Sequence, residues 1–252
     1  MVITIMKKIK IHFLFLVLLL FAFMIGLVKE MFFILICFTI HELGHYFFIK
    51  LFKYKVSNIT IYPFGGIINY QEKNDFIYKT ILIMCGGVLF NLIFVFVFNI
   101  IGFKMLAQIN FYFFLINILP INTLDGGKIL ILLLSLFLPN RLSKIIVYIL
   151  SIVLIIFFMF IFKLDGLYFY FVFAMLLKEN VFSIINVKKE YKKFVLLKHL
   201  NPNDKLKIKE TKFWINNPIE SLFIGRNMIF DYETFKVSEE DILKRYYKTK
   251  KD

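Results

Sequence analysis

Three ionisable side chains stand within five consecutive residues of an apolar stretch, in the order His41-Glu42-Leu43-Gly44-His45. Residues four apart on a helix lie on the same face, so His41 and His45 can direct their imidazoles at one metal ion. Zinc accepts imidazole nitrogens and carboxylate oxygens in a tetrahedral site, and a catalytic zinc site keeps one position for water. Glu42 can reach that water as a general base. The spacing therefore predicts a zinc site with a base beside it.

A third protein ligand has to come from elsewhere in the chain. Glu42 is the only charged residue between positions 31 and 49, and Asp125 is the only one between positions 105 and 127. Ionisable groups within hydrocarbon are costly, and by default they mark a functional site. Asp125, in the segment Leu-Asp-Gly-Gly, is therefore the predicted third ligand.

The composition indicates a membrane protein. Of the 252 residues, 60% are hydrophobic, and the mean hydropathy is +0.77. Soluble domains contain about 45–50% apolar residues, so a water-soluble enzyme is excluded. The net charge is +14, but 16 of the 31 Lys and Arg residues lie from Lys188 onward. We therefore expect a nearly uncharged membrane part with a basic tail and no nucleic-acid partner.

Runs of about twenty apolar residues can cross a bilayer core as helices. Basic residues are expected on the cytosolic side, and their placement in the loops puts both termini in the cytosol. The sequence thus predicts an all-α polytopic membrane protein of about six transmembrane helices, located in the cell membrane. The predicted spans cover residues 9–28, 31–51, 76–103, 105–138 with an interruption at 120–128, 145–162 and 167–186.

Two further segments differ from the spans. Residues 53–75 combine β-prone residues with Gly65-Gly66, which predicts a short membrane-associated β-hairpin beside the helices; an ordinary surface loop is the alternative. Such an edge can capture a substrate as an added strand. The predicted domains are a transmembrane part (1–187) and a small α+β cytosolic tail (188–252), whose last helix begins at Ser238 with Asp241 as capping partner.

Three motifs together resemble the site-2 protease family of intramembrane zinc metalloproteases. They are the His41–His45 pentapeptide, the segment Asn-Ile-Leu-Pro at 117–120 followed by Leu-Asp-Gly-Gly at 124–127, and the segment Gly-Gly-Val-Leu-Phe-Asn at 86–91. The resemblance covers about the first 190 residues and is strongest to the sporulation branch of the family. Thr123 and Gly87 stand where family members often carry proline. The tail resembles a reduced CBS domain.

The resemblance implies roles for individual residues. His41, His45 and Asp125 would be zinc ligands, and Glu42 the base that shuttles the proton. Asn117, near Pro120, would hold the substrate or the developing oxyanion, although its amide could equally satisfy the backbone beside the proline. Gly65 and Gly66 belong to the expected substrate-binding edge.

The resemblance also implies partners. The substrate would be a membrane-associated protein, such as a sigma-factor precursor in the membrane around a forespore, with inhibitory membrane proteins as further partners. Nucleotide binding by the tail stays open.

Two other interpretations compete with that of an intramembrane zinc protease. A transporter or metal carrier could use the same His and Asp residues, but such proteins usually show an internal repeat, and this chain has none. A metalloprotease of the prenyl-protein type would need a glutamate as third ligand, for which Glu179 is the late candidate.

Overall fold

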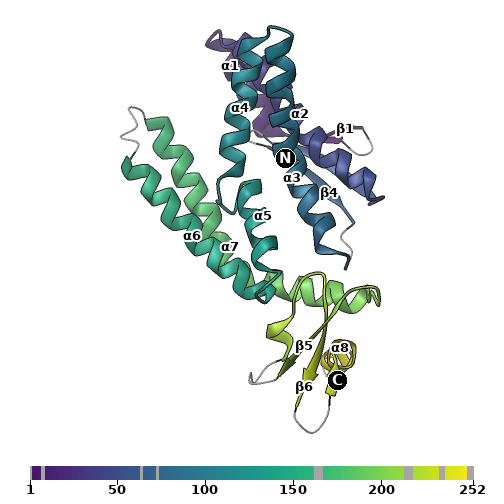
Figure 1. The fold of residues 1–252 in the computed structure, drawn as a ribbon. Helices are drawn as coiled ribbons and strands as arrows, with labels where there is room; N and C mark the ends of the chain where they lie inside the picture. The colour runs from purple at the N-terminus through teal and green to yellow at the C-terminus, as the bar shows by residue number, and fades with distance from the viewer. Residues whose placement is uncertain are drawn as a thin grey trace. The chain divides into compact units, whose positions relative to one another are not determined.

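The computed structural model describes the chain except residues 1, 7–8, 63–64, 72–73, 162–166, 213–217, 233–235 and 249–252. Its contacts divide the chain into two compact units (Figure 1). The first unit comprises residues 1–72 and 82–119, and the second comprises residues 73–81 and 120–252. Each unit is described by itself.

Helices make up most of the first unit. They are α1 (Phe13–Met24), α2 (Val28–Leu51), α3 (Ile77–Ile100), whose first residues belong to the second unit, and α4 (Lys104–Ile118). With 24 residues each, α2 and α3 are about 36 Å long, enough to cross a bilayer core of about 30 Å. The structure thus confirms helices over two of the predicted spans.

Glycines let α2 and α3 approach closely. A Cβ atom on Gly44 would lie 2.2 Å from the carbonyl oxygen of Gly86, and one on Gly86 would lie 2.5 Å from that of Gly44. Small residues permit such contacts between membrane helices. Ile49, Tyr54 and Ile83 form a buried cluster that fixes this pair of helices further along.

A four-stranded sheet accompanies these helices, in the order β1-β2-β3-β4. Its strands are β1 (Val2–Met6), β2 (Ile9–His12), β3 (Val56–Tyr62) and β4 (Gly65–Tyr70). β3 and β4 pair antiparallel, which confirms the predicted hairpin, and β2 pairs parallel with β3. β4 is an edge strand of the described sheet.

The predicted first span is wrong at its start. Residues Ile9–His12 form β2, and α1 begins only at Phe13. With 12 residues, α1 is about 18 Å long, too short to cross the hydrocarbon core as a helix. Residues 9–12 alternate apolar and polar side chains (Ile-Lys-Ile-His), which is the period of a strand, whereas the continuous apolar run begins only at Phe13.

The second unit contains α5 (Asp125–Leu134), α6 (Asn140–Ile161) and α7 (Leu167–Leu200). α6 and α7 run side by side (Figure 1), and Ile131, Val147, Tyr148 and Val187 form their shared core with α5. Within the part of the chain that is described, α2, α3 and α6 are long and apolar enough to span a membrane. The count of six spans stays a prediction.

The tail folds as an α+β module. It comprises β5 (Ile208–Lys212), the 3-10 helix η1 (Pro218–Ser221), β6 (Asn227–Asp231), β7 (Lys236–Ser238) and α8 (Glu239–Lys248). α7 continues past residue 187 and contributes Tyr191 and Val195 to the tail core. As predicted, Ser238 caps the last helix: its Oγ accepts the N–H of Asp241 at 3.2 Å and donates to the Asp241 carboxylate at 2.7 Å.

Candidate metal centre

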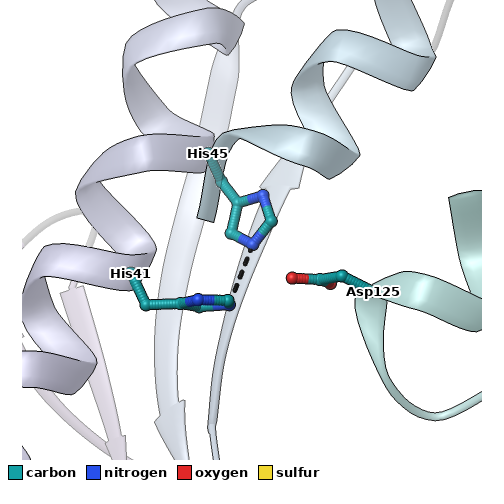
Figure 2. A group of neighbouring side chains, drawn as sticks. All are labelled: His41, His45 and Asp125. Atoms are coloured by element: carbon teal, nitrogen blue, oxygen red, sulfur yellow. Dashed lines mark hydrogen bonds between the residues drawn. The ribbon is translucent and has the colours of Figure 1, made fainter. Parts of the chain in front are cut away.

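α2 carries both histidines on one face, as the four-residue spacing requires. The Nε2 atoms of His41 and His45 lie 3.1 Å apart (dashed line in Figure 2), and their rings meet edge to face. His41 is buried, with 6% of its surface exposed. The structure therefore brings the two predicted imidazoles together and points the same nitrogen of each ring at one place.

The opposite nitrogens of the two rings are held by α3. The Nδ1 of His41 lies 3.2 Å from Oδ1 of Asn91, and the Nδ1 of His45 lies 2.7 Å from the carbonyl oxygen of Ile83. Both partners are acceptors, so each Nδ1 carries a proton and donates it. In a neutral imidazole the other nitrogen then bears a lone pair.

Two lone pairs facing each other at 3.1 Å favour a cation between them. With zinc–nitrogen bonds of about 2.0–2.1 Å and a tetrahedral angle, the two nitrogens of a zinc site lie about 3.3 Å apart. A histidine that binds a metal usually donates its other N–H to a carboxylate, carbonyl or amide oxygen, which fixes the tautomer. The arrangement on α2 and α3 fits a metal site on both counts.

The absence of a side chain at Gly87 provides the space that the two imidazoles occupy. A Cβ atom at this position would lie 2.5 Å from Cε1 of His41 and 2.5 Å from Nε2 of His45. No side chain larger than hydrogen fits there without moving the rings. The departure from the family pattern at Gly87 is thus compatible with the metal site.

The hairpin reaches the predicted general base. The backbone N–H of Gly66 donates to Oε1 of Glu42 at 3.1 Å, and a Cβ atom on Gly66 would lie 2.6 Å from Cδ of Glu42. β4 therefore positions the carboxylate of Glu42. The sequence predicts Gly66 as a substrate-binding residue, and the structure shows in addition that it contacts Glu42.

Asp125 is the first residue of α5 and is 4% exposed. Its Oδ1 accepts from Nζ of Lys128 at 3.1 Å. Figure 2 shows it with His41 and His45, and one possible ligand atom from each of these three side chains lies within 4.8 Å of the others. These three residues are the candidate ligands for a metal ion among the residues that the structure describes. Glu179, the alternative third ligand, is exposed and does not belong to this cluster.

Asn117 and Pro120 take other contacts. Nδ2 of Asn117 donates to the carbonyl of Phe113, one turn back on its own helix, at 3.0 Å. The carbonyl of Pro120 accepts from Ser151 Oγ at 3.3 Å. The amide of Asn117 therefore does not compensate for the missing N–H of Pro120, and a substrate role for either residue stays a prediction. Gly65 opens β4, and its predicted role also stays a prediction.

Asn91 and the carbonyl of Ile83, which contact the two imidazoles, are not identified as site residues by the sequence alone. Asn91 is fully buried in the middle of an apolar helix, where an amide needs a partner. A lone amide at the end of the motif 86–91 in an apolar helix is the sequence signal for such a contact.

Comparison with known proteins agrees with this geometry. Residues 30–105 match the model of peptidase family M50. The matched segment contains the histidine pair, the hairpin and Asn91. The fold is similar to that of the site-2 protease from Methanocaldococcus jannaschii, with a TM-score of 0.53 and 20% identity over 75% of this chain and 94% of that one. These matches agree with the resemblance to the site-2 protease family that the three sequence motifs indicate.

The chain is also similar in sequence to a known bacterial protein. The chain is 29% identical to the stage IV sporulation protein FB of Bacillus subtilis (strain 168) over 124 residues, which is 45% of this chain. The match spans 43% of the length of that protein, less than half. The chain is thus similar to a sporulation protein over part of its length.

Proposed function

We propose that the protein is an intramembrane zinc metalloendopeptidase that cleaves a membrane-associated protein substrate. The observation that carries the proposal is the pair of Nε2 atoms 3.1 Å apart, with both Nδ1 atoms facing oxygen acceptors. The match of residues 30–105 to the model of peptidase family M50 and the helices long enough to cross a membrane support the same function.

His41, His45 and Asp125 would hold the zinc ion. When bound, zinc supplies a water of lowered pKa and polarises a carbonyl oxygen. Glu42, adjacent to the ligand His41 and held by the N–H of Gly66, is placed to accept the proton of that water. It then delivers the proton to the amine of the departing peptide.

The edge of β4 is the proposed docking place for an unwound substrate segment. A strand added to a free edge gains backbone hydrogen bonds. Amides alternate sides along a strand, and the N–H of Gly66 faces Glu42 rather than β3. The backbone N–H of Ile68 then points to the same free edge, whereas the backbone N–H groups of Ile67 and Asn69 point to β3.

Proline at Ile68 therefore tests substrate docking better than proline at Ile67 or Asn69, which would break the hairpin itself. We expect Ile68→Pro to slow cleavage with metal content unchanged. An unaltered cleavage rate would exclude capture at this edge.

The test of the proposed activity is the Glu42→Gln variant in a reconstituted cleavage assay with tagged, membrane-tethered substrates. We expect activity to fall by about 10²–10⁴-fold, the usual contribution of a general base, while one zinc ion per chain is retained. Glu30→Gln, in the first turn of the same helix, is the matched control. A metal carrier would instead keep transporting with Glu42→Gln, and that result would overturn the proposal.

The third ligand has its own test. Asp125→Ala should abolish stoichiometric zinc and activity, whereas Glu179→Ala should leave both intact. The reverse result would favour a protease of the prenyl-protein type.

A sigma-factor precursor is our proposed substrate, with inhibitory membrane proteins as regulators and the forespore membrane as location. The support is the likeness to a sporulation protein. The distribution of loop lysines supports cytosolic termini. Co-expression with a panel of tagged membrane-tethered precursors tests the substrate: cleavage only of precursors unrelated to sigma factors would refute it.

A further inference from the structure

The second unit contains a cavity of about 500 Å³ that the proposed protease activity does not use. Its lining comes from the first turn of α6, the C-terminal part of α7, η1 and α8. Lining residues that matter here include Arg141, Lys188, Lys192, Ile219 and Tyr247. The volume is in the range of small-molecule sites in proteins.

The charge of the lining favours an anion. Four basic side chains line the cavity, those of Arg141, Lys188, Lys192 and Lys193, against one carboxylate, that of Glu220. Glu220 is bonded to the Arg141 guanidinium at 2.6 Å and leaves a net positive lining. A phosphate group is the anion that Arg and Lys recognise together most readily.

The remaining walls are apolar or aromatic. Val195, Leu196 and Ile219 line the cavity beside the tyrosines. The Tyr191 hydroxyl is already engaged, donating to the carbonyl of Ile219 and accepting the N–H of Leu222. Burial raises the pKa of Tyr191, so its ring stays neutral. The cavity therefore suits a ligand with a phosphate at one end and apolar groups attached.

The cavity lies at the polar end of α6, a helix long enough to span a membrane. Arg141 is the second residue of this helix, which has 22 residues. Val187 of α7 packs in one cluster with Val147 of α6, so Lys188 and Lys192 follow toward the same polar end of the helix pair. Basic residues just beyond a span meet the phosphates of anionic lipids.

An exposed apolar stripe on α6 begins next to Arg141. Leu142, Ile146, Ile149 and Val153 are 44%, 38%, 54% and 57% exposed, and their spacing of four, three and four residues places them on one face. On a membrane helix such a face contacts acyl chains. The chain thus offers a phosphate-binding cavity and an acyl-chain surface in direct succession.

We propose that this cavity binds the phosphate headgroup of an anionic membrane phospholipid, whose acyl chains lie along the exposed stripe of α6. The bound lipid would connect α6 and α7 with η1 and α8, and so link membrane composition to the tail. This site is independent of the proposed cleavage chemistry, because none of its residues belongs to the metal centre.

The test uses the full chain in nanodiscs of phosphatidylcholine with or without phosphatidylglycerol, followed by native mass spectrometry of the lipids that stay bound. We expect phosphatidylglycerol to be retained preferentially. A basic residue near a membrane surface contributes about fivefold to the affinity for anionic lipid, so Lys188→Ala/Lys192→Ala should lower the retention about 30-fold. Lys189→Ala, an adjacent lysine that does not line the cavity, is the matched control.

Competition separates the possible sources of the phosphate. Inorganic phosphate or ATP at 1 mM is added to the detergent-purified chain that holds phosphatidylglycerol. Displacement by either, with loss of that effect in Lys188→Ala/Lys192→Ala, would assign the cavity to a soluble anion and overturn the lipid proposal. Equal retention of phosphatidylcholine, or an equal effect of Lys189→Ala, would also overturn it. The wild-type comparison of lipids does not depend on how the variants fold.

Discussion

The Nδ1 atom of His41 lies 3.2 Å from the amide oxygen of Asn91, a residue fifty positions further along the chain and fully buried in α3. This bond decides which nitrogen of His41 is available. Because the amide oxygen can only accept, Nδ1 keeps its proton and Nε2 is left to bind a metal. Asn91, which is not itself a candidate ligand, thereby orients the imidazole of a candidate ligand.

Replacing Asn91 should weaken the metal site. Asn91→Ala removes the acceptor that fixes the ring and tautomer of His41, and losses of this kind typically cost 10–100-fold in metal affinity or activity. Zinc affinity measured by competition with a chelator checks the expectation. Asn99→Ala is the control on the same helix, since Asn99 bonds only the carbonyl of Val95 in its own helix among the contacts found. Equal zinc affinity of Asn91→Ala and wild type would contradict a role of Asn91 in holding the ligand.

Gly87 should tolerate no side chain. In Gly87→Ala the new methyl group would meet His41 and His45 at 2.5 Å, far inside van der Waals contact, so the imidazoles have to move. We expect the affinity for zinc to fall by at least about tenfold. The zinc stoichiometry at limiting metal should therefore fall, and cleavage should be lost in parallel. Leu89→Ala, two residues along and 39% exposed, should retain full zinc. Full zinc occupancy in Gly87→Ala would show that the rings have more room than the structure gives them.

Gly66 should affect catalysis without affecting the metal. In Gly66→Ala the methyl group would meet Cδ of Glu42 at 2.6 Å, which displaces the carboxylate and its bond to the backbone N–H. We expect the cleavage rate to fall by about 10²-fold or more, as for a misplaced general base, with zinc content unchanged. Asn69→Ala, at an exposed position of the same strand, is the control. Loss of zinc from Gly66→Ala would instead assign Gly66 to the metal site.

The candidate ligand residues stand out in the sequence, because spacing on one helix is a local property. His41 and His45 needed only the four-residue period, and Glu42 and Asp125 stood out as isolated charges in apolar runs. Their supporting contacts could not be predicted in the same way. Asn91 and Ile83 reach the imidazoles only because Gly44 and Gly86 let α2 and α3 approach, and no short-range pattern encodes that approach.

The fold shows the same division between local and non-local information. The helices α2, α3 and α6 over three predicted spans and the β3–β4 hairpin follow from hydropathy and turn residues. The pairing of β2 with β3 joins residues fifty positions apart, and the four residues 9–12 are too few to distinguish a strand from the start of the helix that follows. The continuation of α7 into the tail likewise depends on packing of Tyr191 and Val195 in the tail core.

A buried ion pair ties α7 to the last helix of the tail. Nζ of Lys198 donates to Oε1 of Glu239 at 2.6 Å and to the carbonyl of Arg226 at 2.7 Å, and Lys198 is 2% exposed. Oε2 of Glu239 accepts the N–H of Met228 at 3.0 Å. Burial lowers the pKa of Lys198 and raises that of Glu239, while each charge opposes the shift of the other. The pair therefore depends on both members being present.

Removing Lys198 alone should be costly. Lys198→Met leaves the Glu239 charge buried without its partner, which typically costs about 3–5 kcal/mol of unfolding free energy, whereas Lys198→Met/Glu239→Gln should recover most of the loss. In Lys198→Met the pKa of Glu239 lies above its unfolded value, so stability should rise as the pH falls through the folded pKa. Denaturation of the tail at several pH values measures both effects. Lys236→Met, in an exposed pair with Glu210, should cost less than about 1 kcal/mol, and an equal cost at both sites would show that burial does not govern the Lys198 pair.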